Sequence, residues 1–156
     1  MSMHQFRIAV GCDHAGFAYK QQIAALLREK GHEVVDFGTY STDPVDYPLI
    51  GFKVGEAVAS GEFERGVLVC GSSLGIAMAA NKVRGIRAAP ITEPYSAKLS
   101  RQHNDANIIC FGERLTGWEM VVECLTTWLE TEAEGGRHAR RVGELNEYDP
   151  SQKEHV

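Results

Sequence analysis

The feature that most constrains this chain is a regular alternation of short apolar runs with segments of helical period. The strand-length runs are Phe6–Cys12, Glu33–Gly38, Gly66–Cys70, Ile86–Pro90 and Asn107–Phe111. Near-continuous apolar strands that alternate with helices are typical of a parallel sheet buried on both faces. The sequence therefore predicts an α/β fold in which helices cover both sides of one parallel sheet.

Helical segments fill the intervals between these runs. We expect helices at Phe17–Lys30, Pro48–Ser60, Gly75–Lys82, Glu93–Gln102, Gly117–Thr131 and Arg137–Tyr148. Gly31 follows the first of them as a helix stop, and Pro48 is tolerated in the first turn of the second. The length of 156 residues suits a single domain, residues 1–156, with a helical extension over about residues 134–150.

Composition narrows the functional classes. A net charge of −5 gives no support for a nucleic-acid partner, and no apolar stretch approaches the roughly 20 residues that cross a membrane. The N-terminal residues MSMHQFRIAV lack the features of a signal peptide. Cys12, Cys70, Cys110 and Cys124 form no CxxC pair, which argues against a zinc ribbon or a disulfide framework. We therefore expect a cytoplasmic protein with reduced thiols.

The segment after the third strand is the first candidate site, because ligands of parallel sheets bind beyond the carboxyl ends of the strands. Cys70 is followed there by the loop Gly71–Gly75 (GSSLG) and then by a helix. Backbone N–H groups of such a loop converge on an anion, and the same positive field favours the thiolate form of a cysteine. A base beside an oxyanion cradle is suited to enolisation. The plainer alternative is a tight strand-to-helix turn after a packed cysteine.

The spacing of the residues does not match four well-known phosphate-binding or catalytic loop motifs. A Walker loop ends in Gly-Lys-Ser/Thr, which neither Gly71–Gly75 nor Gly11–Gly16 does, and no strand is followed by G-x-G-x-x-G. A nucleophile elbow needs glycine two residues before and after the nucleophile, where Leu68 and Ser72 stand. A cysteine phosphatase loop carries arginine six residues after the thiol, where this chain has Ile76. These mismatches favour proton transfer over hydrolysis.

Two polar clusters supply further candidates. Asp13 and His14 follow the first strand, which neighbours the third in common doubly wound orders, so they would face Cys70 and a sugar or phosphate ligand. Alternatively, Asp13 caps the helix that follows. His103 and Asn104 lie between a helix and a strand, where His103 is the best candidate for a general acid or base. A solvated helix end is the alternative there.

Three arginines have the chemistry of a phosphate clamp. Arg137 and Arg141 are four residues apart and share one face of the last expected helix, and Arg114 follows the fifth strand. A solvated basic patch is the usual alternative for such a run. Because the pair lies close to the C-terminal end, an extension that reaches another subunit would deliver it across an interface.

Seven stretches, in order and covering most of the chain, carry a family resemblance. They are GCDHAGF (Gly11–Phe17), DYP (Asp46–Pro48), CGSSLGIAMAANK (Cys70–Lys82), GIRAA (Gly85–Ala89), EPYSAKLSRQHND (Glu93–Asp105), FGERLTG (Phe111–Gly117) and EGGRHARRV (Glu134–Val142). Together they resemble the sugar-phosphate isomerase family that holds ribose-5-phosphate isomerase B and the galactose-6-phosphate isomerase subunits. The resemblance implies a three-layer α/β/α sandwich with a five-stranded parallel, Rossmann-like sheet. It also implies a homodimer or a dimer of dimers with sites at the interface, and neither a metal nor an organic cofactor.

The same resemblance implies an aldose–ketose isomerase of the pentose phosphate pathway that interconverts ribose 5-phosphate and ribulose 5-phosphate. By that resemblance, Cys70 moves a proton between C1 and C2 through a cis-enediolate, and His103 opens the sugar ring. The remaining implied site residues are the anion hole at Gly71, Ser72, Ser73, Leu74 and Gly75, the sugar contacts Asp13, His14, Tyr47 and Asn104, and the phosphate ligands Arg114, Arg137 and Arg141.

One position departs from the family pattern. The loop usually reads G-S/T-G-x-G, and here Ser73 stands at the middle glycine, where a positive φ would strain it. The departure puts the preferred sugar in question more than the reaction, so isomerisation of allose 6-phosphate or galactose 6-phosphate is an alternative. The competing functions are a non-catalytic sugar-phosphate-binding protein and a thiol hydrolase that uses Cys70 and His103.

Overall fold

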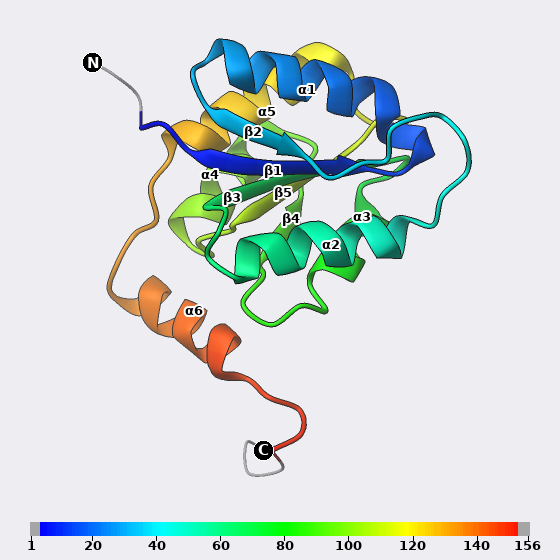
Figure 1. The fold of residues 1–156 in the computed structure, drawn as a ribbon. Coiled ribbons are helices and arrows are strands. Elements are labelled where there is room, and N and C mark those ends of the chain that lie inside the picture. The colour runs from blue at the N-terminus through cyan, green and yellow to red at the C-terminus, as the bar shows by residue number, and fades with distance from the viewer. Residues whose placement is uncertain (1–3, 153–156) are drawn as a thin grey trace.

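A five-stranded parallel sheet forms the centre of the computed structural model, which describes residues 4–152 (Figure 1). The strands are β1 (Arg7–Cys12), β2 (Glu33–Asp36), β3 (Arg65–Cys70), β4 (Ala88–Pro90) and β5 (Ile108–Gly112). Their order is β2-β1-β3-β5-β4, and every neighbouring pair runs parallel. The parallel sheet and the pairing of the first strand with the third were both expected, and both are confirmed.

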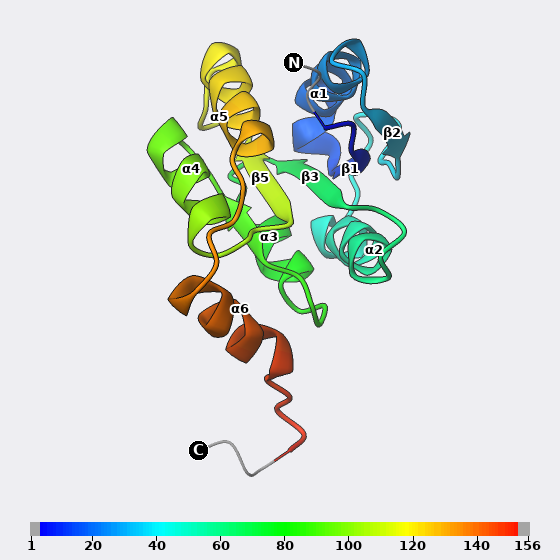
Figure 2. The ribbon, with the colours of Figure 1, turned by 90° about the vertical axis from the view of Figure 1, so that its left-hand side faces the viewer.

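Helices cover both faces of the sheet and give the three-layer sandwich (Figures 1 and 2). One face carries α1 (Phe17–Glu29), α4 (Pro94–Gln102) and α5 (Trp118–Glu130), and the other carries α2 (Tyr47–Ala59) and α3 (Leu74–Ala80). A single 3₁₀ turn at His14–Gly16 precedes α1. None of the helices in the described part of the chain is both long and apolar enough to cross a membrane.

Side chains along the central strands alternate between two hydrophobic cores, as the pleat of a strand dictates. In β3, Val67 and Val69 pack with α1 and α5, whereas Leu68 and Cys70 pack on the side of α2 and α3. Cys70 therefore ends the central strand of the sheet on the α2–α3 side.

Three predicted strands are shorter than expected: the first begins one residue later, at Arg7, and the second and fourth each lose two residues for local reasons. The second ends at Asp36 rather than Gly38, because the Asp36 carboxylate accepts the Gly38 N–H at 2.8 Å and turns the chain. The fourth begins at Ala88 rather than Ile86, because the Ile86 N–H bonds back to the Val83 carbonyl in a turn.

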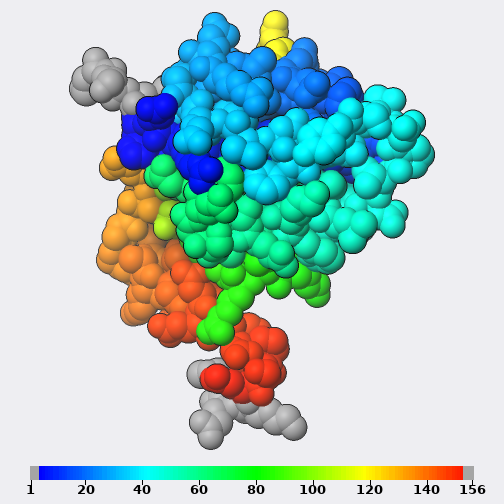
Figure 3. All heavy atoms as spheres, in the orientation of Figure 1, coloured from blue at the N-terminus to red at the C-terminus, as the bar shows by residue number. Residues whose placement is uncertain are grey.

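The last helix, α6 (Arg137–Glu147), stands outside the sandwich (Figures 1 and 2). An extended segment after α5 carries the chain to it, and in Figure 3 the red part of the chain protrudes beyond the main body. His138 is the one buried residue of this fully described helix. Towards its end, the Asn146 side chain accepts a hydrogen bond from Arg87 at 2.6 Å. The C-terminal helix predicted at Arg137–Tyr148 is thus present, one residue shorter.

A buried ion pair fixes the backbone that meets the end of β1. Lys20, 1% exposed, has its Nζ 2.9 Å from Asp36 Oδ2 and also donates to the Thr39 carbonyl. The Thr39 N–H in turn donates to the Cys12 carbonyl at 2.7 Å. Lys20 therefore anchors the segment 36–39 beside the end of β1, which the candidate residues Asp13 and His14 follow.

Replacing Lys20 with methionine should lower the free energy of unfolding by about 3 kcal/mol, because the Asp36 carboxylate loses its buried partner. The double variant Lys20→Met/Asp36→Asn should be more stable than Lys20→Met alone, since the asparagine carries no charge and can still accept the Gly38 N–H. Urea unfolding at pH 7 measures both differences. Equal stability of the single and double variants would mean that the pair's charge is not what holds this segment.

Candidate functional site

A cavity of about 290 Å³ lies at the carboxyl edge of the sheet, where β1, β3 and β5 end. Most of its walls come from residues that the sequence singled out. The lining residues are Asp13, His14, Ala15, Tyr47, Cys70, Gly71, Ser72, Gly75, Arg114 and Leu115. Residues that follow the carboxyl ends of three parallel strands thus border one cavity, which is where a ligand of such a sheet is expected.

Cys70 is the thiol that a ligand in this cavity meets. Its residue is only 4% exposed, yet it lines the cavity rather than being sealed among aliphatic side chains. The other thiols belong to the packed interior: burial raises the pKa of Cys12 and of Cys124 to about 11 each, and it raises that of Cys110 as well. Position alone therefore separates Cys70 from the structural cysteines.

The loop after Cys70 presents unused backbone donors. The N–H groups of Gly71, Ser72 and Ser73 donate to no other group within residues 4–152. The Leu74 N–H instead donates to Ser72 Oγ at 3.4 Å, so it is not part of the expected anion hole in this arrangement. Three adjacent N–H groups beside a thiol are therefore without an acceptor, and those of Gly71 and Ser72 belong to residues that line the cavity, so the predicted anion hole stays a hypothesis with donors to serve it.

Ser73 has the strained backbone that its departure from glycine implied. Its φ is 69°, in the left-handed region, and it occupies the position just before α3. Its residue is 2% exposed and does not line the cavity. The side chain therefore takes no space from a ligand, and its effect is on the backbone.

Asp13 caps the turn after β1 and also lines the cavity. Its Oδ1 accepts the N–H groups of Ala15 at 2.9 Å and Gly16 at 3.2 Å, so the capping alternative is correct. No described donor reaches Oδ2, and the residue lines the cavity, which leaves one carboxylate oxygen for a sugar hydroxyl.

His14 has its tautomer set by the backbone. Its Nδ1 accepts the Val45 N–H at 3.2 Å, so Nε2 carries the proton in the neutral ring. Since His14 lines the cavity, its Nε2–H is available as a donor to a ligand oxygen.

Tyr47 and Arg114 close two sides of the cavity. A Cβ at Gly75 would lie 2.8 Å from the Tyr47 ring, so glycine is required for the ring to reach this position. The Arg114 N–H donates to the Gly71 carbonyl at 3.0 Å, which holds the arginine beside the loop. Arg114 forms no ion pair with a described carboxylate, so its charge is unneutralised at the site.

His103 and Asn104 lie at the opposite edge of the sheet. His103 caps the end of α4, and the Asn104 carbonyl accepts from Arg87 Nε at 3.0 Å, directly before the first residue of β4. Cys70, by contrast, pairs with Gly112 at the far end of β5. Four residue steps of a strand separate these edges by about 13 Å. One chain therefore does not bring Cys70 and His103 together.

The arginine clamp is divided in the same way. Arg137 lies next to His138, whose ring stacks on His103, so α6 belongs to the amino edge together with Arg141. Both arginines are exposed and, within residues 4–152, form no ion pair. The expected grouping of Arg114 with this pair does not occur within a single chain.

Two arginines outside the predicted site, the buried Arg101 and the partly buried Arg87, hold the turn that carries His103. Arg101, 3% exposed, donates to Asp105 Oδ1 at 2.7 Å and to the Ala106 carbonyl at 2.8 Å. Arg87 binds the carbonyl oxygens of Asn104 and Asp105. In the sequence, Arg87 is marked out by its place inside the apolar stretch GIRAA. Its role could not be predicted from that stretch, because its hydrogen-bond partners Asn104 and Asp105 lie 17 and 18 residues away.

Known proteins resemble this chain over most of its length. The family described as Ribose/Galactose Isomerase matches residues 8–145. The chain is 52% identical over 136 residues to ribose-5-phosphate isomerase B of Escherichia coli (strain K12), covering 87% of this chain and 91% of that protein. The structure of Clostridium thermocellum ribose-5-phosphate isomerase B matches with a TM-score of 0.89 at 52% identity, over 90% of this chain and 95% of that one. That of Mycoplasma genitalium ribose-5-phosphate isomerase B with bound ribulose-5-phosphate matches with a TM-score of 0.89 at 36% identity, over 93% and 97%.

Replacing Ser73 with glycine should raise the free energy of unfolding by about 1 kcal/mol, because glycine adopts a positive φ without the steric cost of a Cβ. Ser73→Ala is the matched control: it removes the hydroxyl but keeps the Cβ, so it should bring no gain. Thermal and urea unfolding measure both changes. A stabilised alanine variant would trace the cost to the hydroxyl instead of the backbone.

Proposed function

We propose that this chain, which belongs to the ribose/galactose isomerase family, interconverts ribose 5-phosphate and ribulose 5-phosphate. The observation that carries the proposal is that the Cys70 thiol shares one cavity with Gly71 and Ser72, whose backbone N–H groups are free. Abstraction of a proton from carbon next to a carbonyl needs a base and a cradle for the oxygen that becomes negative. The similarity to ribose-5-phosphate isomerase B proteins supports this choice of sugar.

The reaction begins on the closed sugar. Breaking the C1–O4 bond of the furanose gives an aldehyde at C1, while O4 takes up a proton and the C1 hydroxyl gives one up. His103 is the group proposed to deliver the proton to O4. Asp13 and His14 hold hydroxyl groups of the chain form, through the free Oδ2 and the Nε2–H respectively.

Isomerisation follows on the open chain. The Cys70 sulfur takes the C2 proton, the C–H electrons form the C1–C2 double bond, and negative charge develops on O1 beside the loop N–H groups. The same sulfur returns the proton to C1, and the O2 proton passes to O1 across the cis-enediolate, which leaves the ketone at C2. Atoms and charge balance without an oxidant or a metal.

A second copy of the chain completes each site in this proposal. The half with Cys70 and Arg114 and the half with His103, Asn104, Arg137 and Arg141 lie at opposite edges, so two copies related by a two-fold axis can join unlike halves into two sites. Helix α6 stands outside the sandwich, as a segment that reaches a second copy would, and this supports the proposal. A face of exposed apolar side chains on α2 and α3 offers the partner surface, namely Leu49, Phe52, Leu74 and Met78. Whether dimers pair further into tetramers is an outcome of solution scattering.

Galactose 6-phosphate or allose 6-phosphate finds no specific support in this geometry. The one sequence departure, Ser73, does not line the cavity and so does not reshape it for a longer sugar.

The free thiols favour a cytoplasmic setting. None of the four cysteines, Cys12, Cys70, Cys110 and Cys124, is paired in a disulfide.

Replacing Cys70 with alanine should lower kcat for ribose 5-phosphate at least a hundredfold, because the base is removed. Loss of solvent exchange at C2, followed by NMR in D₂O, reports the same step directly. Stabilisation of the variant by added ribose 5-phosphate should persist. Cys124→Ala, which removes a thiol far from the cavity, is the matched control and should keep wild-type turnover. Retained turnover in Cys70→Ala would exclude this chemistry.

Mixing two inactive variants tests the shared site. Cys70→Ala and His103→Ala each damage a different half, so a mixed dimer has one site with both defects and one intact site. Random re-association after mild unfolding should restore about a quarter of wild-type activity. Each variant treated alone serves as the control. A mixture that stays as inactive as its components would place both residues of a site on one chain.

A further inference from the structure

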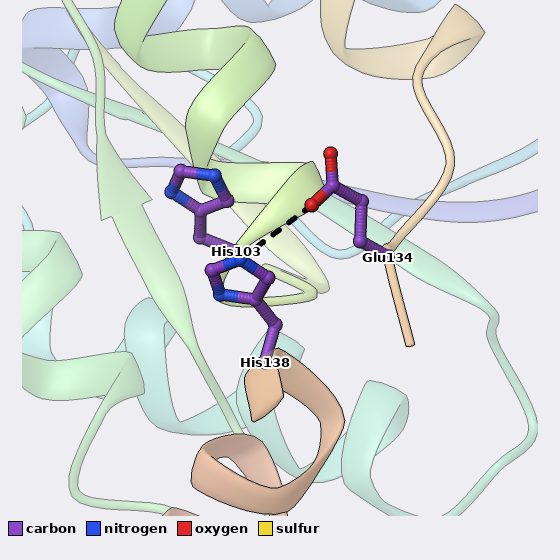
Figure 4. Close-up of side chains that lie close together, drawn as sticks. All are labelled: His103, Glu134 and His138. Atoms are coloured by element: carbon purple, nitrogen blue, oxygen red, sulfur yellow. Dashed lines mark ion pairs between the residues drawn. The ribbon is translucent and has the colours of Figure 1, made fainter. Parts of the chain in front are cut away.

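His103 has an unusual support for a general acid or base. No described residue donates to or accepts from its ring nitrogens, so no hydrogen bond fixes the ring. The contact that does hold it is a stack: the His138 ring lies 4.2 Å away, centroid to centroid, and only 7° from parallel (Figure 4). A stack restrains the plane of the ring and leaves both nitrogens free for a substrate.

His138 is itself held in place. It is 8% exposed, although it lies on a helix whose other residues are not buried. Its Nε2 lies 3.5 Å from Glu134 Oε2, and the Glu134 N–H donates to the Gln102 carbonyl at the end of α4 at 3.0 Å. His138 is thus fastened through Glu134 to the same helix end that carries His103. Loss of water and the nearby His103 ring lower the pKa of His138, which favours its neutral form.

The same three side chains contain ligand atoms that all lie within 4.8 Å of one another, which raises the question of a metal ion. The lone pairs of imidazole nitrogens lie in the ring planes, and metal–nitrogen bonds are about 2.0–2.1 Å long. Two rings stacked 4.2 Å apart and nearly parallel direct their lone pairs side by side rather than towards one point. The arrangement therefore suits a stacked support better than a chelate.

We propose that His138 is a positioning residue, whose ring, held by Glu134, sets the plane in which His103 presents its nitrogens to the closed sugar. This rests on the proposed function, in which His103 opens the ring. It also explains why a buried histidine adjoins the phosphate-binding candidates: Arg137 precedes His138 directly, and Arg141 lies one turn further along α6. The helix then fixes the spacing between the group that opens the ring and those that hold phosphate.

Two substrates distinguish a His138 that positions the His103 ring from a His138 that only holds helix α6 in place. Ribose 5-phosphate is closed and needs ring opening, whereas 4-deoxyribose 5-phosphate lacks O4, cannot form the furanose and needs only the Cys70 step. His138→Leu removes the stack at similar volume, and His138→Phe keeps an aromatic ring. Glu134→Gln keeps an oxygen that can accept from His138, and Glu134→Ala does not.

For His138→Leu we expect kcat with ribose 5-phosphate to fall about three- to tenfold with KM little changed, as expected for loss of one aromatic stack. Turnover of the 4-deoxy sugar should be unaffected. His138→Phe and Glu134→Gln should recover most of the loss, and Glu134→Ala should not. A loosened α6 would instead raise KM for both sugars through misplaced arginines.

Three results would overturn the proposal: equal losses on both sugars, a phenylalanine variant as impaired as the leucine variant, or a ring-current shift of the His103 protons that survives in His138→Leu. Tight binding of Zn²⁺ that requires both histidines would make the cluster a metal site instead. The NMR shift does not depend on activity. A wild-type protein that shows the stack but turns over neither sugar would therefore count against the proposed function and not against the stack.

Discussion

In a parallel sheet, the helix that follows a strand must return the chain to the amino ends of the strands before the next strand begins. This constraint governs the whole molecule. Residues directly after strands gather at the carboxyl edge, and residues directly before strands gather at the amino edge. Cys70 belongs to the first group, and His103, which precedes β5, belongs to the second. The register of β3 with β5 makes the separation unavoidable within one chain.

The fold and the grouping of candidate residues around Cys70 were largely predictable from the sequence, because both follow from local patterns. Apolar runs of strand length gave the parallel sheet, and the rule that ligands bind where parallel strands end brought Asp13, His14 and Cys70 together. Errors at the ends of β2 and β4 came from single hydrogen bonds, such as the Asp36 carboxylate to the Gly38 N–H, which propensity does not register.

The amino-edge half was only partly predictable, since its organisation depends on contacts distant in sequence. His103 and the arginines could be identified by residue type and by resemblance, but the sequence did not predict their distance from Cys70. The partly buried Arg87 and the buried Arg101 each donate to a carbonyl distant in sequence, 17 and 30 residues away respectively. A charged residue in an apolar run does not disclose such partners. The stack of His103 on His138 joins segments 35 positions apart and has no signature in either.

The placement of the two proposed half-sites at opposite ends of the strands has a consequence for evolution. If each site draws on two chains, a duplicated gene can diverge so that one product loses the thiol half and the other the histidine half. The resulting pair would be obligate hetero-oligomers with a single working site per dimer. Dilution would silence such an enzyme before it unfolded, because dissociation alone dismantles every catalytic centre.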